Sequence, residues 1–528
     1  MHNFCAAVIL SFIASFVKKF IGYARDILIA NKIGLGWQMD VFWMAMRFPF
    51  IIRKVLIDGA INAIGLLYWN ELRAQSHTTI NYKKYIWLLV GYCFMITVII
   101  TGIIFIILQW LGPWLLRHFD PSGLTLYYQM TIFLFIGLVV NGISGAITTL
   151  IKANKQVVIP EWLDMSQHIG IICGVISYTY TNDIVNLSCF ALVAEIVRLI
   201  IVTLMAYKII HSAKKNAPTL GASQISDNTI MVDMESPTIP ITVDEAAHIV
   251  YKISNWRGFL HHILRLMAHY SISSVISLGN LIVVSYLPIG AMSAFYYADR
   301  LYQIPTGILG SIFASIILSF YTNTRNPEQH IQLLQVSLKS VFMFLPAVTA
   351  VCIFFADEVV LLIYHNITHF TWISYIFQIY AFAIPFTIIR EIISAIFVTE
   401  KQYKLIIRIN LYILGIYLIT ASLVIQQIID LAYIVLINAI VSCCTTLFYL
   451  QYISHLKNII NNVMINLSKV LIYNLIMAWM AKLLCNYIGI FAVHTFFSAV
   501  QALLIVSGIL ILSNLKHWAQ TLRFMRSA

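Results

Sequence analysis

The sequence predicts an all-α polytopic membrane protein with about fourteen transmembrane helices, on three observations. Of its 528 residues, 60% are hydrophobic and only 10% are charged, whereas a soluble protein carries about 25% charged residues. Mean hydropathy is +0.86. Several runs without Asp, Glu, Lys or Arg exceed the roughly 20 residues that cross a bilayer as a helix: 85–116, 121–151, 266–298, 409–429 and 483–515.

The distribution of apolar runs and basic loops predicts the topology. Basic residues collect in alternate connections, which places both termini on the cytoplasmic side. A polar, Pro-containing cytoplasmic linker at 211–255 divides the chain into six and eight spans, and we expect two lobes around a central cationic cavity. The predicted spans are 5–31, 38–72 (broken), 85–111, 125–151, 157–180, 184–209, 257–286, 290–322, 333–355, 370–398, 405–427, 430–453, 464–486 and 491–515. The predicted domains are 1–210 (N-terminal lobe), 211–255 (linker), 256–455 (C-terminal lobe, helices 7–12) and 456–528 (helices 13–14 and tail).

Composition and motifs exclude several classes of function. The net charge of +12 arises mostly at helix ends, which indicates anionic lipid headgroups and not nucleic acid. The eight cysteines show no CxxC spacing, and no phosphate-binding loop, metal motif or hydrolase motif occurs. We therefore predict a transporter without enzyme activity or cofactor. A coupling ion or the membrane potential stays open as its energy source.

Charges inside apolar spans are costly and usually face a cavity. Three spans carry them, with cations in excess, and an anion such as a pyrophosphate suits a cationic cavity of low dielectric. Two alternatives stay open: Lys18, Arg47 and Lys54 reach the headgroups, or arginines pair with acids on neighbouring helices. The charged residues are Lys18, Lys19, Arg25 and Asp26 in the first span, Asp40, Arg47, Arg53, Lys54 and Asp58 in the second, and Asp299 and Arg300 in the eighth.

Two weaker signals lie in the fifth and sixth spans. Glu195 and Arg198 are three residues apart on one predicted helix, which favours an internal pair. Glu161 and Asp164 stand near a span start and are interpreted as interfacial.

Five short segments, in order, resemble the MurJ (MviN) family of lipid II flippases. The run from Lys19 to Asp26 resembles the family's R-x-x-G-x-x-R-[DE] segment, and Gly34 to Trp43 its G-x-G…D-A-F segment. Arg47 to Arg53 resembles [KR]-x-P-N-x-x-R, and Asp58-Gly59-Ala60 resembles E-G-A. The best match is Tyr296-Tyr297-Ala298-Asp299-Arg300-Leu301 with the following Pro305 to Gly310.

This resemblance, which covers essentially the whole chain, implies a function and a site. The family belongs to the multidrug/oligosaccharidyl-lipid/polysaccharide exporter superfamily and moves the undecaprenyl-pyrophosphate-linked peptidoglycan precursor across the bacterial inner membrane. Membrane lipids, and other cell-wall synthesis proteins, are further expected partners. It implies a groove for the lipid tail at 464–515. The implied site residues are the cations Lys19, Arg25, Arg53 and Arg300, the acids Asp40, Asp58 and Asp299, and Ser293.

Departures from the pattern leave alternatives open. Lys19 stands where the family has arginine, and Phe50 where it has asparagine. A flippase for another polyprenyl-linked polysaccharide, a drug/cation antiporter of the same fold and a membrane scaffold that has lost transport are the rival interpretations. The surplus of cations disfavours the antiporter, since an exporter of cations needs buried carboxylates.

Overall fold

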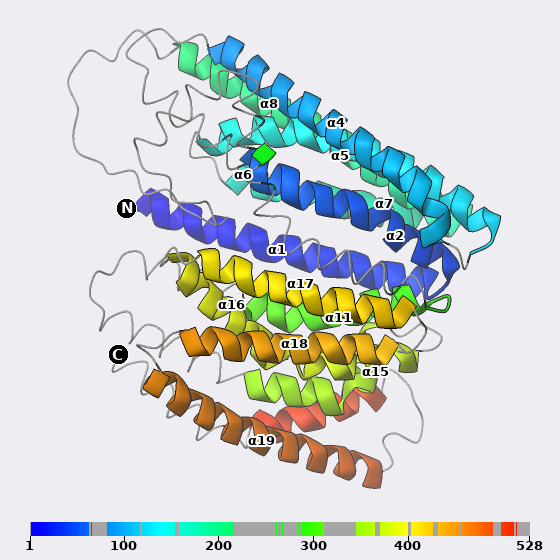
Figure 1. The fold of residues 1–528 in the computed structure, drawn as a ribbon, viewed down its shortest axis with the longest axis vertical. Coiled ribbons are helices and arrows are strands. Elements are labelled where there is room, and N and C mark those ends of the chain that lie inside the picture. Colours follow the sequence, from blue (N-terminus) through cyan, green and yellow to red (C-terminus); the bar gives the residue numbers. More distant parts are fainter. Residues whose placement is uncertain are drawn as a thin grey trace. The chain divides into compact units, whose positions relative to one another are not determined.

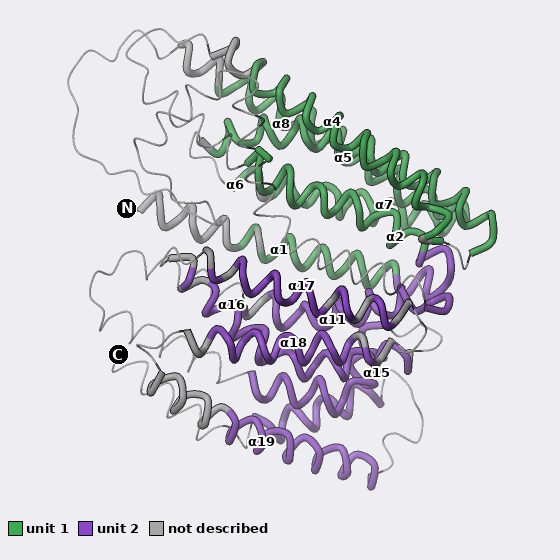
Figure 2. The backbone as a smooth tube through the Cα atoms, in the orientation of Figure 1, with its two compact units in different colours: residues 1–29, 41–278 green, residues 30–40, 279–528 purple. Residues whose placement is uncertain are grey.

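The computed structural model is helical throughout the residues it describes (Figure 1). These residues form two compact units, one of 1–29 and 41–278 and the other of 30–40 and 279–528 (Figure 2). The described residues are 2–62, 65, 82–116, 119–153, 158–215, 260, 263–264, 267, 284, 287–310, 345–364, 370–399, 403–425, 431–452, 457–488, 498–511 and 514.

The first unit is built around α8, which packs mainly against α5 and α7. Glycines allow the close approach of α7 and α8, because a Cβ at Gly170 or Gly174 would collide with the α8 backbone. Its elements are α1 (His2–Ile33, up to residue 29), α2 (Trp37–Ile52), the π-helix η1 (Arg53–Ile61), α4 (Tyr82–Leu115), α5 (Pro121–Ala153), α6 (Val158–Leu163), α7 (Ser166–Thr181) and α8 (Val185–Lys215).

In the second unit, α11 packs on α15, and α18 packs on both α15 and α16. A core of small and apolar residues joins α19 to the helices 345–354 and 498–511, with Ala478, Ala481 and Ala502 fully or almost fully buried. Small side chains permit close helix contacts in membranes. The elements are α11 (Ala291–Pro305), the π-helix η2 (Thr306–Gly310), α14 (Ala356–Ile363), α15 (Phe370–Ala381), α16 (Ile384–Thr399), α17 (Tyr403–Ile425), α18 (Leu431–Tyr452) and α19 (Lys457–Tyr487).

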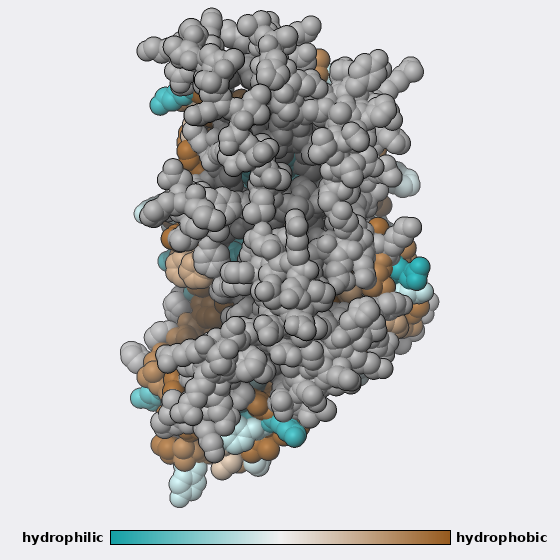
Figure 3. All heavy atoms as spheres, turned by 90° about the vertical axis from the view of Figure 1, so that its left-hand side faces the viewer, coloured by the Kyte–Doolittle hydropathy of each residue, from teal (hydrophilic) through white to brown (hydrophobic). Residues whose placement is uncertain are grey.

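The outer surface is apolar, as a lipid-facing surface requires. On α4, Ile103, Ile106 and Trp110 are more than half exposed. Apolar side chains make up most of the described surface visible in Figure 3. Hydrocarbon and not water is therefore the solvent for these faces.

Within the described residues, four helices are long and apolar enough to span a membrane, or up to six if two bent pairs count as single spans. The prediction of a multi-span helical membrane protein is confirmed, while the count of fourteen stays a prediction. The four are 88–114, 121–152, 185–209 and 468–487.

Several predicted spans are more irregular than expected. The second continues from α2 into η1, and the fifth is divided into α6 and α7. The ninth bends by 86° at residue 355 and the tenth by 49° at residues 382–383. Residues 211–215 of the predicted linker are the last residues of α8, and most of the seventh span and the remainder of the linker lie outside the described residues.

A buried amide pair gives the first testable prediction. Asn474 on α19 and Asn514 exchange side-chain hydrogen bonds of 3.2 and 2.7 Å. Asn474→Leu or Asn514→Leu deprives the other buried amide of this partner, so we expect a loss of about 1 kcal/mol in stability. Thermal unfolding of the purified protein measures the loss. Ser507→Ala, on the exposed face of the same helical hairpin, is the control and should have no effect. A double leucine variant less stable than either single one would contradict the pairing.

Candidate functional site

Arg53 is the first residue of the π-helix η1, and this geometry determines its first partner. In an α-helix, residues five apart point about 140° away from each other, whereas i→i+5 geometry aligns them. Arg53 Nε accordingly lies 3.6 Å from a carboxylate oxygen of Asp58. The side chain of Arg53 is 14% exposed and that of Asp58 is 53% exposed. Asp58 is thus the solvent-facing partner of a mostly buried cation.

On its buried side, Arg53 belongs to a closed ring of alternating charges, which we call the charge quartet. Arg53 Nη2 lies 3.7 Å from Asp164 Oδ1, and Arg53 Nη1 lies 3.6 Å from Glu195 Oε1. Arg198 closes the ring, with a very short contact to Asp164 Oδ1 and a 3.7 Å contact to Glu195 Oε2. Two guanidinium groups and two carboxylates cancel, so the quartet is neutral.

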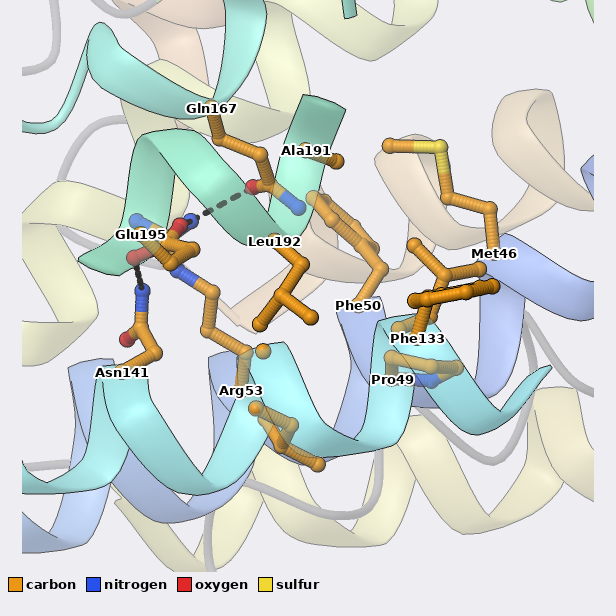
Figure 4. A pocket seen from close by; sticks show the side chains of 13 residues that line it. Met46, Pro49, Phe50, Arg53, Phe133, Asn141, Gln167, Ala191, Leu192 and Glu195 are labelled. Carbon is orange, nitrogen blue, oxygen red and sulfur yellow. Dashed lines mark hydrogen bonds and ion pairs between the residues drawn. The ribbon is translucent and has the colours of Figure 1, made fainter. Parts of the chain in front are cut away.

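Neutral side chains complete the environment of the quartet. Asn141 Nδ2 on α5 donates to Glu195 Oε2 at 2.7 Å, and Arg53 Nη1 donates to Gln167 Oε1 at 2.6 Å. Arg53, Asn141, Gln167 and Glu195 gather at one end of a pocket (Figure 4). Apolar side chains line its other end, including Met46, Pro49, Phe50 and Phe133.

Arg25 is the second buried cation of the first unit. It is 2% exposed, and its Nε donates to Asp26 Oδ1 at 2.8 Å. Its Nη1 lies 3.1 Å from Nδ1 of His168, the residue next to Gln167 on α7. The first turn of α7 therefore contacts both Arg25 and Arg53, through adjacent residues. Lys18 lies 3.6 Å from Asp164, and Lys19 beside it is partly exposed.

In the second unit, Asp40 caps the N-terminus of α11. The capping position is Gly290, which has a φ of +89° and no side chain that could accept hydrogen bonds from the first N–H groups of the helix. Asp40 accepts hydrogen bonds from Gly290 N at 2.6 Å and Ser293 N at 2.8 Å, and a very short one from Ser293 Oγ. Asp40 is 2% exposed. A carboxylate at a helix N-terminus neutralises the helix dipole and the orphan N–H groups together.

Arg300 and Asp299 lie on one polar face of α11. The Arg300 guanidinium lies 4.7 Å from the centre of the Tyr296 ring, and it donates to Tyr296 Oη at 2.6 Å. It also donates to Gln303 Oε1 at 2.8 Å, and Gln303 donates to Asp299 Oδ2 at 2.6 Å. Tyr296 and Gln303, with Asp299 behind Gln303, hold the planar guanidinium in a defined orientation.

The structure groups the sequence-predicted residues within each unit. Arg53 and Asp58 lie together in the first, Asp40 and Ser293 together in the second, and Asp299 and Arg300 are linked through Gln303. One alternative paired Arg25 with an acid on a neighbouring helix. The acid it contacts among the described residues is Asp26, the next residue on the same helix.

One residue has a larger part in the site than the sequence indicated, and three site residues were not predicted. The pair of Glu195 and Arg198 is confirmed. Asp164, which was interpreted as interfacial, contacts both Arg53 and Arg198 in the quartet. Asn141, Gln167 and His168 were missed, although polar residues in an apolar span are a usable signal. The described residues contain no cluster of His, Cys, Asp and Glu arranged to hold a metal ion.

Comparisons with known proteins give the class. The family model "Lipid II flippase MurJ" matches residues 29–502. A probable lipid II flippase MurJ of Aquifex aeolicus is 20% identical over 412 residues, covering 77% of this chain and 74% of its own. One of Rhizobium tropici is 22% identical over 419 residues, covering 74% and 72%.

Solved structures share the fold. A lipid II flippase MurJ in an inward closed conformation superposes with a TM-score of 0.70 at 19% identity, covering 97% of this chain and all of the other. An inward-facing multidrug transporter of the MATE family gives 0.55 at 17% identity, covering 85% and 99%.

The helical fold shared with these structures, together with a family model of flippases over residues 29–502, defines the chain as a membrane transporter. Within that class, the family model covers most of the chain. The chain belongs to the MurJ family of lipid II flippases.

The cap on α11 gives the second prediction. Asp40→Ala leaves the buried N–H groups of Gly290 and Ser293 without their acceptor, so we expect a stability loss of about 2 kcal/mol. Asp40→Asn should lose less, because one side-chain oxygen still accepts. Thermal unfolding in detergent measures both, with the unaltered protein as the reference. If the Asp40→Ala protein unfolds at the same temperature as the unaltered protein, the cap does not contribute to stability.

Proposed function

We propose that this protein moves lipid II from the cytoplasmic to the periplasmic leaflet of a bacterial inner membrane by alternating access. The observation that carries the proposal is the match of the lipid II flippase family over residues 29–502. The buried arginines on the family-like segments support it, because the substrate's pyrophosphate is an anion that guanidinium groups bind through paired N–H donors.

The proposed substrate-binding residues lie in each unit. Lys19, Arg25 and Arg53 supply positive charge in the first and Arg300 in the second, Asp58 and Asp299 hold arginines in place, and Asp40 with Ser293 supports α11. Arg53 and Arg300 are favourable candidates because each is held by neighbouring side chains, which lowers the entropy lost on binding.

We further propose the complete architecture of fourteen spans in lobes of six and eight, with both termini cytoplasmic. Residues 464–515 form the groove for the lipid tail, and 211–255 form a cytoplasmic linker. The apolar faces of α19 support the groove, since Ile472, Ile476 and Trp479 are exposed. The cycle uses no cofactor, and a coupling ion or the membrane potential supplies its energy.

Complementation tests the function. The chain is expressed in a bacterium depleted of its own lipid II flippase, and growth with normal cell shape is the expected result. A membrane protein of unrelated function, expressed at equal abundance, is the control. Failure to support growth despite normal abundance, together with transport of another polyprenyl-linked saccharide or of a cationic drug, would contradict the proposal.

The proposed cations give the third prediction. Arg25→Ala, Arg53→Ala and Arg300→Ala should each abolish complementation with the protein still in the membrane. Arginine to lysine at these positions should restore activity at most in part, because a point charge replaces a bidentate donor. Lys19→Arg should be harmless. Growth is scored beside a blot of the membrane fraction, and normal growth of all three alanine variants would contradict the cationic site.

A further inference from the structure

The charge quartet poses a problem that the proposed function does not solve. In the structure Arg53 is already neutralised, by Asp164 at 3.7 Å and by Glu195 at 3.6 Å. A pyrophosphate that engages Arg53 has to compete with these internal carboxylates. When Arg53 turns to the substrate, Glu195 loses one of its two guanidinium partners, while Asp164 keeps both Arg198 and Lys18. In a region of low dielectric, a carboxylate whose charge is compensated less well is costly.

Asp164 and Glu195 differ in the cationic partners that each keeps after Arg53 has left. Asp164 keeps its short contact with Arg198 and has Lys18 at 3.6 Å, and Lys152 also acts on it. Its side chain is 19% exposed. Among the described cations, Glu195 keeps the 3.7 Å contact to Arg198, which Asp164 shares, and its side chain is 4% exposed. Glu195 is therefore the carboxylate whose charge is compensated least when Arg53 leaves.

The side chain of Asn141 is placed so that a protonated Glu195 could form a second hydrogen bond with it. A protonated carboxyl group and a primary amide can exchange two hydrogen bonds, one N–H to oxygen and one O–H to oxygen. The first exists, from Asn141 Nδ2 to Glu195 Oε2 at 2.7 Å. The second needs a proton between Glu195 Oε1 and Asn141 Oδ1, and both are buried oxygens that accept no hydrogen bond among the described residues.

We propose that Glu195 is a proton-binding site coupled to the substrate: it takes up one proton when Arg53 leaves it for the substrate's pyrophosphate, and releases the proton when Arg53 returns. The proton comes from water and adds to the carboxylate, giving a neutral carboxylic acid bonded to Asn141. Arg53 and Glu195 both line the same pocket. The inference rests on the proposed function, because it takes Arg53 as a substrate ligand.

The other charged and titratable groups around Glu195 do not substitute for it. Asp58 is the remaining acid near Arg53, and its side chain is 53% exposed, so water stabilises its charge after Arg53 departs. Across the packed elements, the groups facing the quartet are Arg53 and Asp58 of η1, Lys152 of α5, Asp164 after α6, Gln167 and His168 of α7, Arg198 of α8, and Lys18, Arg25 and Asp26 of α1.

The test counts protons during binding of lipid II to the full-length protein in nanodiscs. Calorimetric titrations at one pH, in two buffers of different protonation enthalpy, give the number of protons taken up. We expect close to one proton per bound lipid II, and an affinity that weakens by up to about tenfold per pH unit as the pH rises. Binding without net proton uptake would overturn the inference and leave the proposed function intact. Absence of lipid II binding at every pH would instead overturn the proposed function.

Two variants assign the proton to Glu195. Glu195→Gln imitates the protonated acid, because its amide can donate to Asn141 Oδ1, so binding should be at least as tight and lose both the pH dependence and the proton. Asp120→Asn is the control, since it removes an exposed carboxylate outside the proposed site and keeps a side-chain acceptor, and it should keep the proton uptake. Uptake that persists in Glu195→Gln would overturn the assignment. If Glu195→Gln does not accumulate, the proton count on the unaltered chain decides alone.

Discussion

Charge buried in an apolar helix bundle has to be balanced inside the bundle, because neither hydrocarbon nor a thin layer of water can solvate it. Each unit meets this requirement differently. The first closes two arginines and two carboxylates into the neutral quartet. The second uses the N–H groups of α11 to hold Asp40, and an aromatic ring with a glutamine to hold Arg300. The contacts between helices near these residues therefore include the groups that neutralise or solvate the buried charges.

Irregular backbone places the decisive side chains. The π-helix η1 begins at Arg53, four residues after Pro49, and η2 begins one residue after Pro305. Proline removes an N–H from the helical ladder, and π-helical turns frequently occur at functional sites. In η1 the altered register aligns Arg53 with Asp58 on its exposed side while the guanidinium still reaches α7 and α8.

The sequence predicted the helical membrane fold and several of its long helices, because hydropathy over twenty residues is a strong signal. The predicted spans 85–111 and 125–151 lie within α4 and α5. The buried arginines were also visible, since a charge in an apolar run is conspicuous. Their partners were not, because Gln167 stands 114 residues after Arg53 and no local pattern joins them. The π-helical register and the 86° bend likewise have no periodic signature in the sequence.

The quartet has a consequence for how the protein is made. Arg53 enters the membrane with an early span, but Asp164, Gln167 and Glu195 are synthesised more than a hundred residues later. At about 5–20 residues per second, this delay is on the order of ten seconds. During that time the arginine has neither of its buried carboxylates, so the second span has to wait at the insertion machinery or at the lipid interface. Assembly of the first unit is therefore completed by the arrival of α8.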